Sequence, residues 1–166
     1  MSDNPAGEIY SDNPNDPELL AKHARAEAMV KGFHYAKPEG VKAGKGSVNL
    51  ARTDLLRVSV QIVKKNGGEN NLHFHDNGDS FWMVLSGRVR FYGPDDVVTG
   101  EYGPMEGTVT PAFSRYWFEN VGEGDLELMH VSALKDTHLR KSGRTDLSKQ
   151  KYEVGSSDKF DARKAL

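Results

Sequence analysis

The stretch HFHDNGDSFWMVLSG, residues 73–87, places two histidines one residue apart at the start of an apolar run. In a β-strand, residues two apart point to the same face, so His73 and His75 project together while Phe74 points away. Two neighbouring imidazoles can bind one divalent metal, because Zn, Fe, Mn, Co, Ni and Cu all accept imidazole nitrogen. A strand with a polar outer face gives the same pattern, so the pair alone does not decide between them.

Runs of alternating apolar and polar residues recur between Ser47 and Ala133, separated by turn sequences such as NGG at 66–68 and DNGD at 76–79. Short strands with regular turn signals are typical of a sandwich or barrel, and no helix-length period interrupts them. The sequence therefore predicts an all-β domain over 47–133. The expected strands lie within 47–53, 55–65, 71–75, 80–85, 88–93, 97–102, 108–111, 115–121 and 126–133.

Two extensions flank this domain. Residues 1–46 begin with a polar arm and continue into a predicted helix over 17–31, with Asp16 as N-cap, Pro17 at the first helical position and Gly32 at the end. Its apolar residues are expected to form one buried stripe: Leu19, Leu20, Ala24, Met29 and Val30. Residues 134–166 are polar and charged, and we expect this extension to pack on the barrel or on a second subunit.

The composition sets limits on the function. The chain has 166 residues with 37% hydrophobic side chains, enough for one modest core. Its net charge of −2 gives no reason to expect nucleic acid or an acidic membrane as partner. No apolar run is long enough to span a bilayer and no signal-peptide pattern opens the chain, so we expect a cytoplasmic protein. The absence of cysteine excludes disulfides and thiolate chemistry, and leaves nitrogen and oxygen ligands for any metal.

The histidine stretch resembles the first motif of the cupin superfamily: a glycine, five residues, HxH, three or four residues, a glutamate, six residues and a glycine. Here Gly67 precedes His73 by five intervening residues, and Gly87 closes the run. Pro111 and Asn120 stand where the second cupin motif has its proline and asparagine. The resemblance covers residues 47–133 and implies a double-sheet jelly roll with a pocket inside.

The departures from the two motifs concern the metal ligands. The resemblance implies four ligands, namely the two histidines, the glutamate and a second-motif histidine. Ser80 stands at the glutamate position, with Asp79 one residue earlier, and Tyr116 replaces the second-motif histidine. Phe113 replaces the glycine of that motif.

Three functions fit this altered motif. In the first, one divalent transition metal (Fe, Mn, Zn, Ni or Co) is held by His73, His75 and Tyr116, with open positions for an oxygenase or a metal-assisted lyase or hydrolase reaction. His130 is a spare ligand if its strand turns it inward. In the second, there is no metal, and Tyr116 and His75 act as acid and base in a lyase or isomerase. In the third, the jelly roll binds a small molecule without chemistry.

Aromatic residues suggest the nature of the substrate. Four residues are candidates to line its pocket: Trp82, Phe113, Phe118 and Ser80. They favour a planar or partly apolar small molecule. Arg57, Ser59 and Gln61 share one strand face, which could bind a carboxylate but is more often the solvent side. By analogy with cupins, we expect a homodimer.

Overall fold

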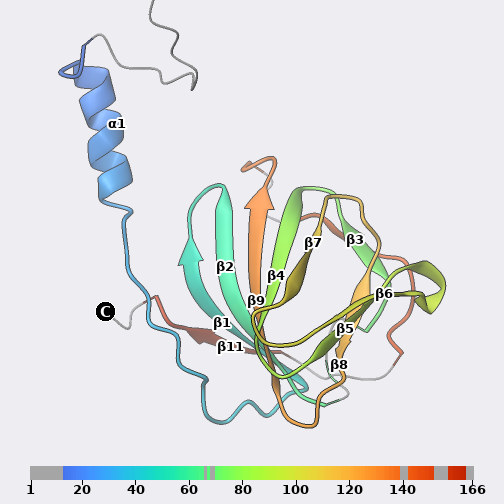
Figure 1. Ribbon diagram of the computed structural model, residues 1–166. Helices are drawn as coiled ribbons and strands as arrows, with labels where there is room; N and C mark the ends of the chain where they lie inside the picture. The colour runs from blue at the N-terminus through green and yellow to red at the C-terminus, as the bar shows by residue number, and fades with distance from the viewer. Residues whose placement is uncertain (1–12, 66, 68–69, 139–141, 152–156, 164–166) are drawn as a thin grey trace, which may run out of the picture. The chain divides into compact units, whose positions relative to one another are not determined.

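The computed structural model describes residues 13–65, 67, 70–138, 142–151 and 157–163 (Figure 1). The chain divides into two compact units, Met1–Lys31 and Gly32–Leu166. Within these described ranges, the strands all lie in the second unit and the α-helix lies in the first. No helix in the described ranges is long and apolar enough to cross a membrane.

The helix α1 spans Pro17–Glu27 and begins as predicted, because the Asp16 carboxylate accepts a hydrogen bond from the Glu18 N–H at 3.3 Å. It ends four residues before the predicted position. Beyond it, the N–H groups of Met29 and Val30 donate hydrogen bonds to carbonyls three residues back, in the 3-10 pattern that often closes a last turn. No residue of α1 is buried, so the predicted apolar stripe is wrong: two of its five residues lie beyond the helix and the others find no core within this unit.

The larger sheet has six strands in the order β11-β1-β2-β9-β4-β7. Neighbours are antiparallel, except that β11 runs parallel to β1. The bounds are β1 Lys45–Arg52, β2 Leu56–Val63, β4 Gly78–Ser86, β7 Gly107–Thr110, β9 Leu126–Leu134 and β11 Ser157–Asp161.

A second layer faces this sheet (Figure 1). It contains β6-β5-β8 and the pair β10-β3, and a bridge between His73 and Tyr116 joins the two groups. The bounds are β3 His73–His75, β5 Val89–Tyr92, β6 Val98–Tyr102, β8 Trp117–Asn120 and β10 Arg144–Asp146, with a 3-10 turn at Pro94–Asp96. All nine predicted strands are therefore confirmed, and the all-β double-sheet jelly roll with its N-terminal helix stands as predicted.

The C-terminal extension packs on this barrel, because β11 pairs with β1 and β10 pairs with β3. Neither strand was predicted. The three residues of β10 are all exposed, and no residue of β11 is buried, so their sequences carry no apolar alternation.

The buried apolar side chains form two clusters, one between the layers and one on the outer face of β1 and β2. The cluster between the layers consists of Val63, Trp82, Val84, Val89, Phe91, Tyr116, Phe118, Leu126 and Leu128. A second cluster on the outer face consists of Val41, Val48, Leu50, Val60 and Ile62, against which Tyr35 and Phe160 pack. The polar face of β2, with Arg57, Ser59 and Gln61, therefore points between the layers. The expectation that it faces solvent is wrong, because the outer face of this strand is covered as well.

Candidate functional site

The two histidines of β3 lie inside the jelly roll. His73 is fully buried and His75 is partly buried. Their ring centroids are 5.3 Å apart, with the ring planes nearly perpendicular. This arrangement follows from strand alternation, which turns both rings to the face opposite Phe74.

The tautomer of His73 is fixed by its surroundings. Nδ1–H donates to the carbonyl oxygen of Asn71 at 2.8 Å, so Nε2 carries the lone pair. Nε2 is buried and has no hydrogen-bond partner in the described part of the chain. Burial lowers the pKa of His73 to about 4, with a further contribution from the nearby Arg144. The ring is therefore neutral at pH 7, and its bare nitrogen is an available ligand or base.

His75 is held in a similar way by the C-terminal extension. Its Nδ1 and the hydroxyl of Ser142 are hydrogen-bonded at 2.8 Å. Burial lowers the pKa of His75 to about 4, and His73 and Arg144 lower it further. Because the bond engages Nδ1, Nε2 is left for another partner.

Tyr116 packs against this pair. Its ring centroid lies 4.5 Å from that of His73 and 6.3 Å from that of His75. Its hydroxyl is hydrogen-bonded to Thr110, and burial raises its pKa to about 12. Thr110 also accepts a hydrogen bond from the Trp82 indole N–H at 3.0 Å. Tyr116 is thus a neutral phenol in a fixed position.

At the place of the missing glutamate, a serine and a histidine bind each other. Ser80 points inward, and its hydroxyl is 2.9 Å from Nε2 of His130. The His130 ring lies flat on Trp82, with centroids 3.9 Å apart and planes 4° from parallel. Asp79 is exposed on the opposite face, where its carboxylate accepts from the Ala112 N–H at 2.8 Å. His130 and Ser80 therefore join the interior, and Asp79 does not.

The aromatic candidates are divided between the core and the surface. Trp82 and Phe118 are only 2% and 0% exposed and belong to the cluster between the layers. Phe113 is 64% exposed, and its ring stacks on Phe74 at 6.0 Å. His73, His75, Tyr116, Ser80 and Trp82 are thus brought together, while Phe113 lies on the outside.

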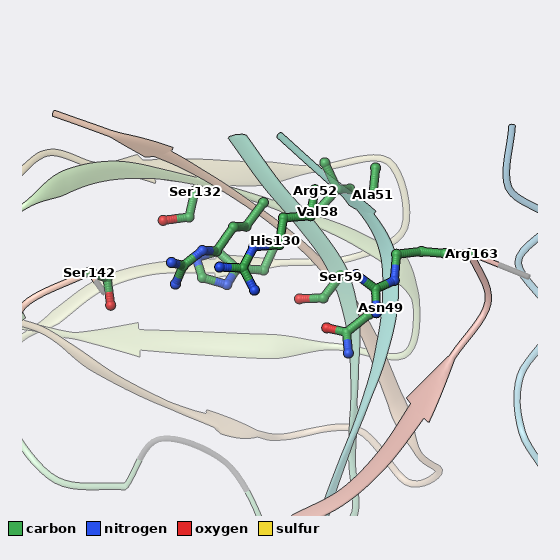
Figure 2. Close-up of a pocket in the computed structure, with 10 residues that line it drawn as sticks. Asn49, Ala51, Arg52, Val58, Ser59, His130, Ser132, Ser142 and Arg163 are labelled. Carbon is green, nitrogen blue, oxygen red and sulfur yellow. The ribbon is translucent and has the colours of Figure 1, made fainter. Parts of the chain in front are cut away.

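A cavity of about 320 Å³ opens beside His130 (Figure 2). Its basic residues are Arg52, Arg57 and Arg163, and its polar residues include Asn49, Ser59, Ser132 and Ser142. Trp82, Phe113 and Phe118 are not in this lining, which is polar and basic where an aromatic lining was expected. Ser142 connects the cavity to the histidine pair, since it lines the one and bonds the other.

Two cations lie in the interior: Arg57, which the sequence offered as a possible carboxylate ligand but more often as a solvent-facing residue, and Lys45, which the sequence reasoning missed. Arg57 lines the cavity, and Lys45 lies close enough to His73 and His130 to lower their pKa values. Burial also lowers the pKa of Lys45 to about 7. The available signal was the polar alternation of Lys45, Ser47 and Asn49 in β1, which matches that of Arg57, Ser59 and Gln61 in β2.

The ligand set is small. Among the residues that the structure describes, no group of three or more His, Cys, Asp or Glu side chains could hold a metal ion. His73 and His75 supply two imidazole nitrogens with their other nitrogens engaged, which is how metal-binding histidines are usually oriented. The donors thus fit two positions of a borderline metal, and any further ligand must be the Tyr116 phenol, water or substrate.

No family model and no curated protein matches the sequence. Solved structures do match in fold. An RmlC-like cupin family protein from Methanocaldococcus jannaschii superposes with a TM-score of 0.54 at 14% identity, over 68% of this chain and 98% of that one. KdgF from Halomonas sp. gives 0.54 at 14% identity, over 65% and 98%.

A protein with a double-stranded β-helix domain from Klebsiella pneumoniae gives a TM-score of 0.51 at 15% identity, over 70% of this chain and 92% of that one. At such identities the likeness concerns the fold. The chain has the fold of the cupin superfamily, the double-stranded β-helix, and the fold predicted from its two sequence motifs is confirmed.

Proposed function

We propose that this chain is an enzyme that acts on a small molecule at the His73–His75 pair, where Nε2 of both rings would hold one divalent transition metal. The observation that carries the proposal is the buried Nε2 of His73, which has no partner among the described residues. A buried polar atom without a partner is costly, so it points to a ligand or metal that completes it. A core histidine without such a role would be expected to have both nitrogens satisfied.

The bound metal would supply Lewis-acid activation of a substrate oxygen or of water. The residues of the chain have their own tasks. Asn71 and Ser142 fix the two imidazole rings through Nδ1, and Thr110 fixes the Tyr116 hydroxyl. Tyr116, as a neutral phenol, can donate a hydrogen bond to an oxyanion that develops on the substrate. The apolar cluster beneath these rings excludes water from one side.

The charges around the pair favour weak metal binding. Besides burial, the charges of Arg144 and Lys45 lower the pKa of His73, and the charge of Asp146 opposes them. Positive charges that repel a proton also repel a metal cation. This observation supports a second candidate, a metal-free lyase or isomerase in which Tyr116 and a neutral histidine act as acid and base.

The deciding experiment is metal content by inductively coupled plasma mass spectrometry, on protein without a histidine tag and after reconstitution with Fe, Mn, Zn, Ni or Co. We expect near-stoichiometric metal in the wild type and loss of it in His73→Ala/His75→Ala. The matched control is His23→Ala/His34→Ala, which removes two exposed histidines outside the barrel. Equal metal in both double variants, or none in the wild type, would refute the metal site. Turnover that survives chelation but not Tyr116→Phe would then identify the second candidate.

A further inference from the structure

The cavity beside His130 has an excess of positive charge. Arg52 at the end of β1, Arg57 at the start of β2 and Arg163 after β11 all contribute to its lining, and none of the aspartates and glutamates that the structure describes does. Figure 2 shows the side chains of Arg52, Ser59, Asn49 and Arg163 around the same space as His130. Three separate segments of the chain thus bring guanidinium groups to one small cavity.

Two of these arginines are held close together. Burial and the charge of Arg52 both lower the pKa of Arg57, although an arginine is strongly solvated by preference. Asp54 lines an adjoining pocket of about 110 Å³, to which both arginines also contribute. An anion in the main cavity would relieve this repulsion.

Arg163 contributes differently. Its guanidinium forms a two-point ion pair with Asp161, with N–O distances of 2.8 and 2.5 Å. The carboxylate holds the planar group in position and cancels much of its charge. Arg52 and Arg57 are therefore the two guanidinium groups whose like charges act on each other in this lining.

The remaining lining residues are neutral hydrogen-bonding groups. Asn49, Ser59 and Ser132 offer amide and hydroxyl groups, and His130 is neutral because burial lowers its pKa to about 3. A volume of about 320 Å³ lies at the lower end for small-molecule pockets. The lining suits a compact molecule with one charged end and a few hydroxyl or carbonyl groups.

We infer that this cavity binds a small organic oxyanion, with Arg52 and Arg57 pairing with its carboxylate or phosphate and Asn49, Ser59 and Ser132 bonding its polar atoms. The inference rests on the proposed function in that this anion is the substrate of the histidine pair, which it approaches past Ser142. Guanidinium groups recognise planar carboxylates and phosphates through paired N–H donors, and this sets the ligand class.

Isothermal titration calorimetry with charged and neutral analogues tests this binding. The probes are benzoate with benzamide, and glycerol 3-phosphate with glycerol, each titrated into the full chain without added metal. We expect benzoate or glycerol 3-phosphate to bind, and its neutral analogue to bind at least roughly tenfold more weakly. The reason is that a buried charge pair loses about 1.4 kcal/mol or more when one partner is removed. The class that binds identifies carboxylate or phosphate as the anionic group.

Variants then locate the binding. Arg52→Gln and Arg57→Gln should each lower the affinity for the anion by about tenfold or more. Arg25→Gln, which removes the same charge from α1, should leave this affinity unchanged. Ser59→Ala keeps both arginines and provides a milder loss if the Arg57 variant is poorly folded. No binding of either anion to the wild type, equal binding of the neutral analogues, or unchanged affinity in the folded arginine variants would overturn the inference. Metal content is measured separately. If the His73–His75 pair binds no metal, the titrations still show whether the cavity binds an anion.

Discussion

The hydroxyl of Ser142 and Nδ1 of His75 are hydrogen-bonded at 2.8 Å, although 67 residues separate them in the sequence. Ser142 precedes β10, which pairs with β3, and Arg144 and His75 are opposite each other in that pairing. The C-terminal extension is therefore a structural part of the candidate site. It orients the more exposed of the two histidines.

Replacing Ser142 by alanine should weaken metal binding. Loss of a bond that orients a histidine ligand typically costs roughly 10-fold to 100-fold in affinity. Titration with Co²⁺, followed by its visible absorption, would measure the change. Ser86→Ala removes an exposed hydroxyl from β4 and should leave the affinity unaltered. Equal Co²⁺ affinity in the Ser142 variant would mean that the ring is positioned without the extension.

His130 should make the stability depend on pH below neutrality. Burial lowers its pKa from 6.5 to about 3, so between these values the unfolded state binds a proton that the folded state does not. The histidine therefore contributes stability above pH 6.5 that is lost as the pH falls. The expected loss is about 1.4 kcal/mol per pH unit, or about 2 kcal/mol by pH 5.

Urea unfolding of wild type and His130→Gln at pH 7, 6 and 5 would isolate this effect. Glutamine can still bond Ser80 but does not titrate, so the wild type should lose stability faster than the variant. His138→Gln, at an exposed position, should follow the wild type. Parallel curves for wild type and His130→Gln would show that His130 is protonated at its ordinary pKa.

The strands could be predicted because the alternation of apolar residues matches the pleat of a sheet. This holds for β4, where Ser80, Trp82 and Val84 are buried and Phe81 is exposed. It fails for β10 and β11, which are held by backbone pairing and contain no buried side chain. Apolar alternation arises only where one face of a strand is buried, so strands without buried side chains cannot be recognised from it.

Only those residues of the site that belong to the two motifs could be predicted from the sequence. Spacing identified His73, His75 and Tyr116, and the structure brings their rings together. It could not place His130, which meets Trp82 through the register of β4 and β9. Nor could it place Arg57, because β2 has both faces covered and alternation alone does not say which face is inside. These contacts depend on strand pairing across long separations.

Phe113 occupies a backbone conformation that suits the glycine it replaces. Its φ is +66°, in the left-handed region that costs a side-chain-bearing residue about 1–2 kcal/mol. Its N–H donates to the His75 carbonyl at 2.7 Å, which holds the turn against β3. The variants Phe113→Gly and Phe113→Ala both lose the stacking on Phe74. The difference between their free energies of unfolding therefore reflects the backbone conformation alone.

We therefore expect Phe113→Gly to be more stable than Phe113→Ala by about 1 kcal/mol, from the free energy of unfolding in urea. The control is the same pair at Val109, an exposed residue of β7 that is not in the left-handed region. There alanine should be the more stable, by about 0.5–1 kcal/mol. The same order at both positions would argue that the turn at Phe113 carries no strain.

Lys45 should weaken the fold at neutral pH and stop doing so in base. Burial, together with the charges of Arg144 and Lys159, lowers its pKa from 10.5 to about 7. Between pH 7 and 10.5 the unfolded state binds more protons, so the wild type gains stability as the pH rises through this window. The gain should be about 2 kcal/mol between pH 7 and 9.

Lys45→Met removes the charge and keeps the length of the side chain. This variant should be more stable than the wild type at pH 7. The advantage should shrink steadily toward pH 9, because removing the proton from the buried lysine costs less free energy as the pH approaches its unfolded-state pKa of 10.5. Lys42→Met, at an exposed position three residues earlier, should show no such trend. Urea unfolding at pH 7, 8 and 9 measures both variants. A constant difference between wild type and Lys45→Met across this range would place the ammonium group in water, and it would then contribute nothing to the positive charge around His73 and His130.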